Sequence, residues 1–130
     1  MGVPLVMVRS AVWFDIPVRD LDRAIGFYSA VLSAEVTREV YPNFTIGLLP
    51  HGDDGVAGCL LTSGDTKPST EGILLYFNAN GRLEEAVAAA EAHGGRVLEP
   101  PHPIGSFGFR AVVLDSEGNR IALHSERLVA

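Results

Sequence analysis

Three ionisable side chains are the first candidates for chemistry in this sequence: Asp15, Arg120 and His124. A carboxylate, a guanidinium and an imidazole that lie close together could orient an anionic or carbonyl ligand, and the imidazole could transfer a proton near neutral pH. We therefore predict Asp15 and His124 as catalytic residues and Arg120 as a substrate-binding residue. The structural alternative is that Asp15 and Arg120 form an ion pair in a wet groove, while His124 is a hydrogen-bonded residue at a strand edge.

Aromatic and thiol side chains could complete a ligand site around these three residues. Trp13 and Tyr76 could stack on a planar ligand, or they could fill the space in which a ligand would sit. Cys59 would be nucleophilic only with a depressed pKa, and a buried cysteine more often acts as a small apolar residue. The complete predicted substrate-binding set is Trp13, Cys59, Tyr76, Asn78, Phe107, Phe109 and Arg120.

Phe107 and Phe109 belong to a segment rich in proline and glycine, residues 100–109, which we expect to be a long connection between strands. Its glycines would allow it to close over a ligand, whereas its prolines would equally suit a rigid connector. The remaining histidines are expected in loops or at a helix end, and they form no clustered ligand motif such as two histidines four apart on a helix. They are His51, His93 and His102.

The chain contains an internal repeat with an offset of 62 or 63 residues. The run 55–62 falls against the run 118–125 at the larger offset. At the smaller offset Leu21 matches Leu83, Ala24 matches Ala86, and Ile25 matches Val87. A repeat of this length indicates two stacked copies of one supersecondary unit.

The first copy is predicted to be a strand, a helix and three further strands. Alternating apolar residues over 11–18 indicate a strand with one face in the core, and Asp20 is a suitable N-cap for a helix over about 21–32. The further strands are expected at about 34–39, 42–49 and 56–62.

The second copy repeats this order, and two such sheets could curl around a shared cleft that would hold a ligand. Its elements are a strand at 72–79, a helix at about 82–93, and strands at about 96–99, 108–114 and 119–125. We therefore predict an α+β fold with two βαβββ modules, at about 11–63 and 72–125, in a single domain that spans 1–130.

Size and charge limit the classes of function. At 130 residues and 47% apolar composition, the chain can bury the core of one domain. Its net charge of -6 repels a phosphate backbone, so we do not expect nucleic acid as a partner. One cysteine cannot form an internal disulfide, and the apolar N-terminus meets Arg9 too early for a signal core or a membrane span, so we expect a cytoplasmic protein.

Two segments of the sequence resemble the vicinal oxygen chelate superfamily, which includes glyoxalase I, bleomycin-resistance proteins and extradiol dioxygenases. One is the opening segment 16–28, Ile-Pro-Val-Arg-Asp-Leu-Asp-Arg-Ala followed by Phe27 and Tyr28, and the other is the closing segment 115–124, Asp-Ser-Glu-Gly-Asn-Arg-Ile-Ala-Leu-His. The resemblance covers residues 11–125. It implies a paired βαβββ fold, a homodimer, and a cup that holds a divalent metal with one ligand from the first and last strand of each module.

The positions that match the metal ligands of the family carry unsuitable residues here. They are Trp13 and Cys59 in the first module and Leu74 and Ala122 in the second. These residues cannot build the shell of histidine and carboxylate that such a metal needs, so we predict no metal and no other cofactor. If these positions mark the open face of each sheet, strand alternation places the candidate residues Asp15, Tyr76, Asn78, Arg120 and His124 on that face too.

The resemblance therefore implies a glyoxalase-like, metal-independent protein that binds a small organic molecule in its cup, with or without catalysis. Two alternatives remain open. One is a metal-dependent lyase or isomerase of the glyoxalase type with other ligands. The other is a non-catalytic protein-interaction module.

Overall fold

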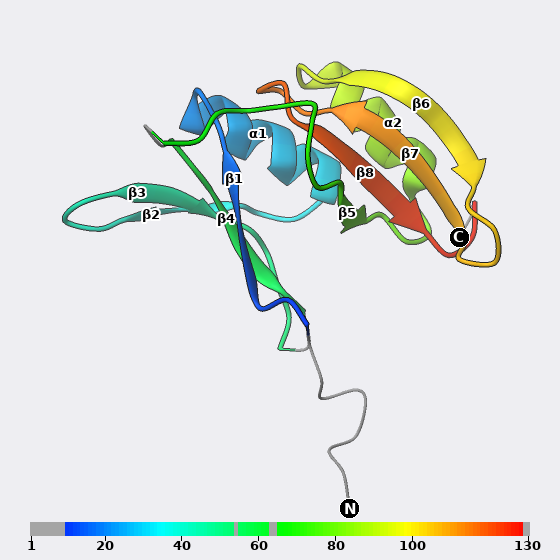
Figure 1. Ribbon diagram of the computed structural model, residues 1–130, viewed down its shortest axis with the longest axis horizontal. Coiled ribbons are helices and arrows are strands. Elements are labelled where there is room, and N and C mark those ends of the chain that lie inside the picture. Colours follow the sequence, from blue (N-terminus) through cyan, green and yellow to red (C-terminus); the bar gives the residue numbers. More distant parts are fainter. Residues whose placement is uncertain (1–9, 54, 63–64, 129–130) are drawn as a thin grey trace, which may run out of the picture.

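The computed structural model describes residues 10–53, 55–62 and 65–128 (Figure 1). The first half contains β1 (Trp13–Pro17), α1 (Leu21–Leu32), β2 (Thr37–Val40), β3 (Thr45–Leu48) and β4 (Ala57–Leu61). The second half contains β5 (Leu75–Asn78), α2 (Leu83–Ala92), β6 (Arg96–Pro103), β7 (Phe109–Leu114) and β8 (Arg120–Ser125). The predicted α+β fold with two βαβββ units is confirmed.

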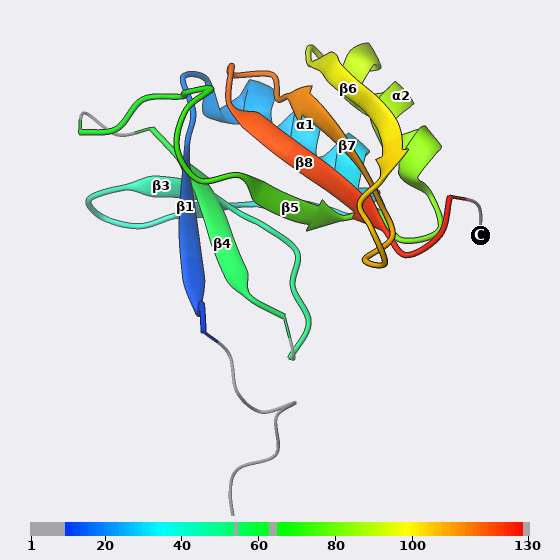
Figure 2. The same ribbon diagram turned by 45° about the vertical axis from the view of Figure 1, so that its right-hand side comes forward.

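Within the described residues, the strands form two mixed sheets of four strands each, in the orders β1-β4-β3-β2 and β5-β8-β7-β6. In each sheet the first and last strands of the unit pair in parallel, and the other pairs are antiparallel. Figures 1 and 2 both show β5 on the side of the second sheet that is nearer to the first sheet. The edge strands β1 and β5 therefore lie where the two units meet.

The helices bury one face of each sheet. Ala24, Phe27, Tyr28 and Val31 of α1 and Leu83, Ala86 and Ala90 of α2 are buried, at the spacing of one helix face. Phe14 of β1 meets Phe77 of β5 edge-on within this core, with ring centroids 6.1 Å apart. Of the described helices, neither has the length and apolar content to cross a bilayer.

The turn between β7 and β8 fastens the second unit to the first helix of the first unit. The carboxylate of Glu117 accepts hydrogen bonds from the backbone N–H groups of Arg19 and Asp20, both at 2.8 Å, and from the Arg23 guanidinium at 2.7 and 2.9 Å. Two backbone N–H groups immediately before α1 are thereby satisfied. Beside them, the Tyr28 hydroxyl donates to Asp115 at 2.6 Å inside the core.

The ionisation of Glu117 reflects this contact. Burial by itself raises the pKa of the carboxyl group, but hydrogen bonds from Arg23, Asp20, Ser116 and Arg19 favour the charged form. The result is a pKa lowered to about 2. Glu117 is therefore a charged, buried part of the junction between the units.

The strand β6 is longer than predicted. The sequence prediction ended this strand at residue 99 and treated 100–109 as a connection, but β6 continues to Pro103 and carries His102. Because β6 is an edge strand, its prolines do not remove hydrogen bonds from a ladder on the outer side. The register with β7 shifts on both sides of Glu99, which accommodates the irregular backbone.

Candidate functional site

The open face of the first sheet carries a small hydrogen-bonded group around Asp15. Parallel pairing places Asp15 of β1 opposite Cys59 of β4. The carboxylate oxygen Oδ1 of Asp15 accepts from the Trp13 indole N–H at 2.8 Å and from the Cys59 thiol at 3.4 Å. Burial, followed by the hydrogen bond and the charge of Asp15, raises the pKa of Cys59 to about 12. The thiol is therefore protonated at neutral pH and unsuited to act as a nucleophile.

The four positions that match the family's metal ligands provide no suitable donor set. Trp13, Leu74 and Ala122 offer no ligand atom of the required kind, and Cys59 supplies a single thiol. Over residues 10–53, 55–62 and 65–128, no group of three or more His, Cys, Asp and Glu side chains is placed to hold a metal ion. The residues at these positions do not fit the metal.

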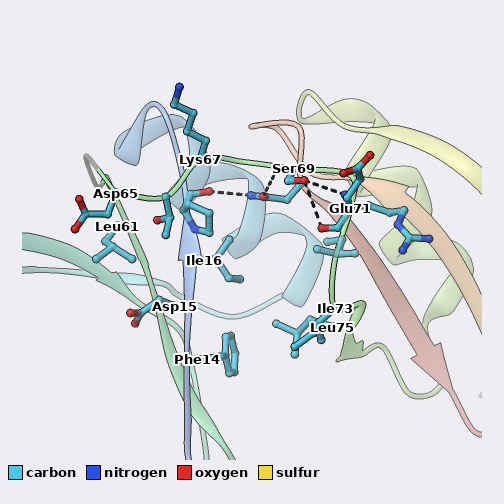
Figure 3. Close-up of a pocket in the computed structure, with 15 residues that line it drawn as sticks. Phe14, Asp15, Ile16, Leu61, Asp65, Lys67, Ser69, Glu71, Ile73 and Leu75 are labelled. Atoms are coloured by element: carbon cyan, nitrogen blue, oxygen red, sulfur yellow. Dashed lines mark hydrogen bonds between the residues drawn. The ribbon is translucent and has the colours of Figure 1, made fainter.

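A cavity of about 590 Å³ lies between β1 and β5, and we call it the β1–β5 crevice (Figure 3). Its apolar walls come from Phe14 and Ile16 of β1 on one side and from Leu75 of β5 and Ile121 of β8 on the other. These side chains belong to the edge of the core, where the two sheets diverge. The walls can therefore enclose an apolar group of a ligand.

The segment between β4 and β5 forms the polar rim of the β1–β5 crevice, with Asp65, Lys67, Ser69 and Glu71. Asn119 holds this segment in place: its side-chain amide donates to the Pro17 carbonyl at 2.8 Å, and its Oδ1 accepts from the Ser69 backbone N–H at 3.0 Å. The backbone N–H of Arg120 also donates to the Ser69 carbonyl, at 3.1 Å. The rim is thus anchored at the point where β8 begins.

The predicted cluster of Asp15, Arg120 and His124 does not form. Asp15 and Arg120 both line the β1–β5 crevice, but in the described part of the chain the Arg120 guanidinium makes no ion pair or side-chain hydrogen bond. His124 lies at a different cavity. Strand alternation predicted all three residues on the open faces of the sheets, but it could not determine the distances between strands of different sheets.

A second cavity, of about 370 Å³, is lined by Tyr76, Phe77, Asn78, Ile104 and His124, and we call it the His124 hollow. The predicted residues Tyr76, Asn78 and His124 come together here because β5 pairs with β8 in the register that sets Asn78 opposite His124. The Nε2 atom of His124 lies 2.6 Å from the Phe107 carbonyl oxygen. The predicted catalytic residues Asp15 and His124 are therefore separated between the two cavities.

The two phenylalanines predicted to bind substrate occupy neither cavity. The Phe107 residue is 77% exposed, and it contacts His124 through its backbone carbonyl. Phe109 begins β7 and packs against the core, because strand alternation turns it away from the face that carries Arg110.

Three polar residues near the His124 hollow were missed by the sequence prediction: Glu99, His102 and Arg110. The Arg110 guanidinium donates to His102 Nε2 at 3.0 Å and to the Tyr76 hydroxyl oxygen at 2.5 Å, and it lies 3.6 Å from the Glu99 carboxylate. An arginine inside the otherwise apolar strand Phe-Arg-Ala-Val-Val-Leu was the available signal. The assignment of 100–109 to a loop concealed its partners on β6.

The chain matches the family described as the Glyoxalase/Bleomycin resistance protein/Dioxygenase superfamily over residues 10–123. No curated protein matches it significantly. Among solved structures, a glyoxalase/bleomycin resistance protein from Albidiferax ferrireducens is 22% identical with a TM-score of 0.68, and the match covers 88% of this chain and 96% of that chain. A glyoxalase/bleomycin resistance protein from a Streptomyces species is also 22% identical with a TM-score of 0.68, over 88% and 99% of the two chains.

A glyoxalase I mutant from Zea mays has a TM-score of 0.69 at 20% identity, and the match covers 88% of this chain but 45% of the longer maize chain. At these identities the structural likenesses show the fold. The family match extends over most of the sequence and agrees with the two βαβββ units. The chain therefore belongs to the Glyoxalase/Bleomycin resistance protein/Dioxygenase superfamily.

Proposed function

We propose that this protein binds a small organic molecule in the β1–β5 crevice and that it does so without a metal ion. The observation that carries the proposal is the crevice itself, about 590 Å³ with apolar walls and a polar rim. Cavities of roughly 300–1,000 Å³ with this combination of surfaces are the usual form of sites for small ligands.

The crevice is lined by the cationic side chains Lys67 and Arg120 beside the carboxylates Asp15, Asp65 and Glu71, and its cationic groups can bind an apolar ligand that carries a carboxylate or a similar anionic group. The Arg120 guanidinium has no partner among the described side chains, and a guanidinium binds a carboxylate through two parallel hydrogen bonds. Asp15 lies between the wall residues Phe14 and Ile16 in the sequence, and its carboxylate already accepts hydrogen bonds from Trp13 and Cys59. These hydrogen bonds reduce its repulsion of an anionic ligand.

The absence of a metal requirement rests on the residues at the family's ligand positions. One thiol, one indole and two aliphatic side chains do not supply the three or four donor atoms with which a protein holds such a divalent cation. The ligand would instead be held by apolar contact and by one charge-assisted hydrogen-bonded pair.

Calorimetric titration with 2-naphthoate tests this proposal, because the probe combines an apolar ring system with one carboxylate. In buffer with EDTA we expect saturable binding with one site per chain. Arg120→Gln should weaken it about tenfold or more, as expected for the loss of a charge-assisted hydrogen bond. Arg96→Gln is the matched control, because Arg96 lies exposed on the edge strand β6, and it should bind as the wild type does.

Two results would contradict the proposal. One is binding that appears only after zinc, nickel or manganese is added, which would point to a metal site. The other is equal affinity in the wild type and Arg120→Gln, or no saturable binding to either protein.

A further inference from the structure

The His124 hollow presents a set of hydrogen-bonding groups that the β1–β5 crevice does not share. We propose that this hollow is a second binding site, selective for a neutral molecule that presents an amide edge, a carbonyl next to an N–H, as in a lactam or a carboxamide. The proposal concerns a separate cavity and does not depend on ligand binding in the β1–β5 crevice.

The contact of His124 with Phe107 fixes which ring nitrogen carries the proton. A backbone carbonyl can only accept a hydrogen bond, so Nε2, which lies 2.6 Å from the Phe107 oxygen, must carry the hydrogen. In the neutral ring, Nδ1 is then left with a lone pair. His124, which lines the hollow, therefore has one hydrogen-bond acceptor to offer.

Tyr76 and Asn78 offer donors to the same hollow. The Tyr76 oxygen accepts from Arg110 at 2.5 Å, which leaves its own O–H free to donate and polarises it through a charged partner. The Asn78 side chain uses Oδ1 to accept from the Asn80 backbone N–H at 2.8 Å. Its NH₂ group has no acceptor among the described residues, and both side chains are exposed.

Two donors and one acceptor complement an amide edge. The carbonyl oxygen of a ligand has two lone pairs, so it can accept from Tyr76 and Asn78 together, while its neighbouring N–H donates to Nδ1 of His124. Arg110, which contacts the Tyr76 hydroxyl, lies 3.6 Å from the Glu99 carboxylate, and the two charges largely offset one another. A neutral ligand therefore suits the hollow better than an ion, and Ile104 supplies apolar contact for its carbon atoms.

Binding of 2-pyrrolidinone, compared with N-methyl-2-pyrrolidinone, tests the inference. The two probes differ in the N–H that His124 is proposed to accept. Followed by NMR through the His124 ring protons, 2-pyrrolidinone should give saturable shifts with a dissociation constant on the order of millimolar, as expected for so small a ligand. The N-methyl compound should bind about tenfold more weakly, because Nδ1 is left without its partner.

Substitutions identify the groups involved, with binding to each variant measured by calorimetry. Tyr76→Phe and His124→Phe should each weaken 2-pyrrolidinone about tenfold. The matched controls are Tyr41→Phe, on the β2–β3 hairpin, and His93→Phe, at the C-cap of α2, and both should bind normally. Arg120→Gln should also leave the affinity unchanged, which separates this site from the β1–β5 crevice.

The inference is overturned if the two probes bind equally, if neither gives saturable shifts, or if Tyr76→Phe and His124→Phe bind as tightly as their controls. Thermal unfolding of each variant establishes that it is folded at the temperature of the titration. If the wild-type protein binds 2-pyrrolidinone but not 2-naphthoate, the result contradicts the proposed function and leaves this inference standing.

Discussion

At the scale of single residues, Asp15 determines the chemistry of its neighbours. One carboxylate oxygen holds the Trp13 indole and the Cys59 thiol, so the aromatic ring and the sulfur are fixed against the open face of the first sheet. Burial and the nearby negative charge both disfavour a thiolate, and the pKa of Cys59 is raised to about 12. The arrangement favours an inert sulfur.

We predict that Cys59 reacts slowly with iodoacetamide. With a pKa of about 12, only about one thousandth of the thiol is ionised at pH 9. Asp15→Asn removes the charge but leaves the burial, so alkylation should become several-fold faster, as measured by mass spectrometry over time. Asp22→Asn, on the exposed side of α1, should have no effect. If the wild-type protein is alkylated at the rate of free cysteine, the ionisation of the Cys59 thiol is not suppressed.

The sequence supplied the types of these residues but not their grouping. Strand alternation correctly placed Trp13, Asp15, Tyr76 and Asn78 on exposed faces, since alternation depends only on neighbours along the chain. Whether Asp15 meets Arg120 or Cys59 depends on the spacing between strands that lie far apart in sequence. That spacing is determined by the packing of the two units.

At the scale of elements, the packing of β4 on β1 depends on a glycine. Gly58 lies opposite Phe14, and a Cβ atom at this position would approach the Phe14 ring to 2.5 Å. Phe14 in turn meets Phe77 and forms a wall of the β1–β5 crevice. Because Gly58 has no side chain, the Phe14 ring can pack over it and cover the core at this edge.

Gly58→Ala should lower the free energy of unfolding by about 1–3 kcal/mol, because the Phe14 ring must move from its packed position. Urea unfolding monitored by circular dichroism measures this change. Gly26→Ala is the control: Gly26 lies inside α1 with open space around it, so alanine should stabilise the protein by about 0.5–1 kcal/mol. Similar stability of Gly58→Ala and the wild type would mean that the ring adjusts without cost.

Most elements were predictable because their patterns are local. Apolar spacing and the Asp20 N-cap defined α1, and alternation defined most strands within a few residues. The end of β6 was not predictable in this way, since Pro100, Pro101 and Pro103 would exclude a strand from the middle of a sheet. Only the position of β6 at an edge, which is a property of the assembled sheet, makes these prolines acceptable.

At the scale of the whole molecule, Glu117 links the two units across 94 to 98 residues of sequence. Its carboxylate completes the N-terminus of α1 and pairs with Arg23, although it belongs to the final turn of the second unit. The sequence prediction left residues 115–118 as the short connection between the strands at 108–114 and 119–125. It could not identify the turn as a junction, because no local pattern records a partner so far away.

Glu117→Gln should lower the free energy of unfolding at pH 7 by about 2–3 kcal/mol, since the amide leaves Arg23 and the start of α1 without their buried charge partner. Because the folded-state pKa of about 2 is below the ordinary value of 4.5, the carboxylate contributes fully above pH 4.5, and the contribution is lost as the pH falls toward 2. The difference between wild type and variant should therefore shrink over this range in urea unfolding experiments.

Glu35→Gln is the matched control for this measurement, because Glu35 is exposed after α1, and its stability should follow the wild type at every pH. A constant difference between wild type and Glu117→Gln from pH 7 to pH 2 would contradict the assigned role of the Glu117 charge.

The same junction has a consequence for synthesis on the ribosome. Arg23 leaves the ribosome 94 residues before its partner Glu117, which corresponds to roughly 5–20 s at ordinary rates of translation. During this interval the start of α1 has the Asp20 side chain as a cap, through its hydrogen bond to the Arg23 backbone, but lacks the Glu117 carboxylate. The first half of the nascent chain therefore gains its stabilising contact with Glu117 only when nearly all of the second half has been made.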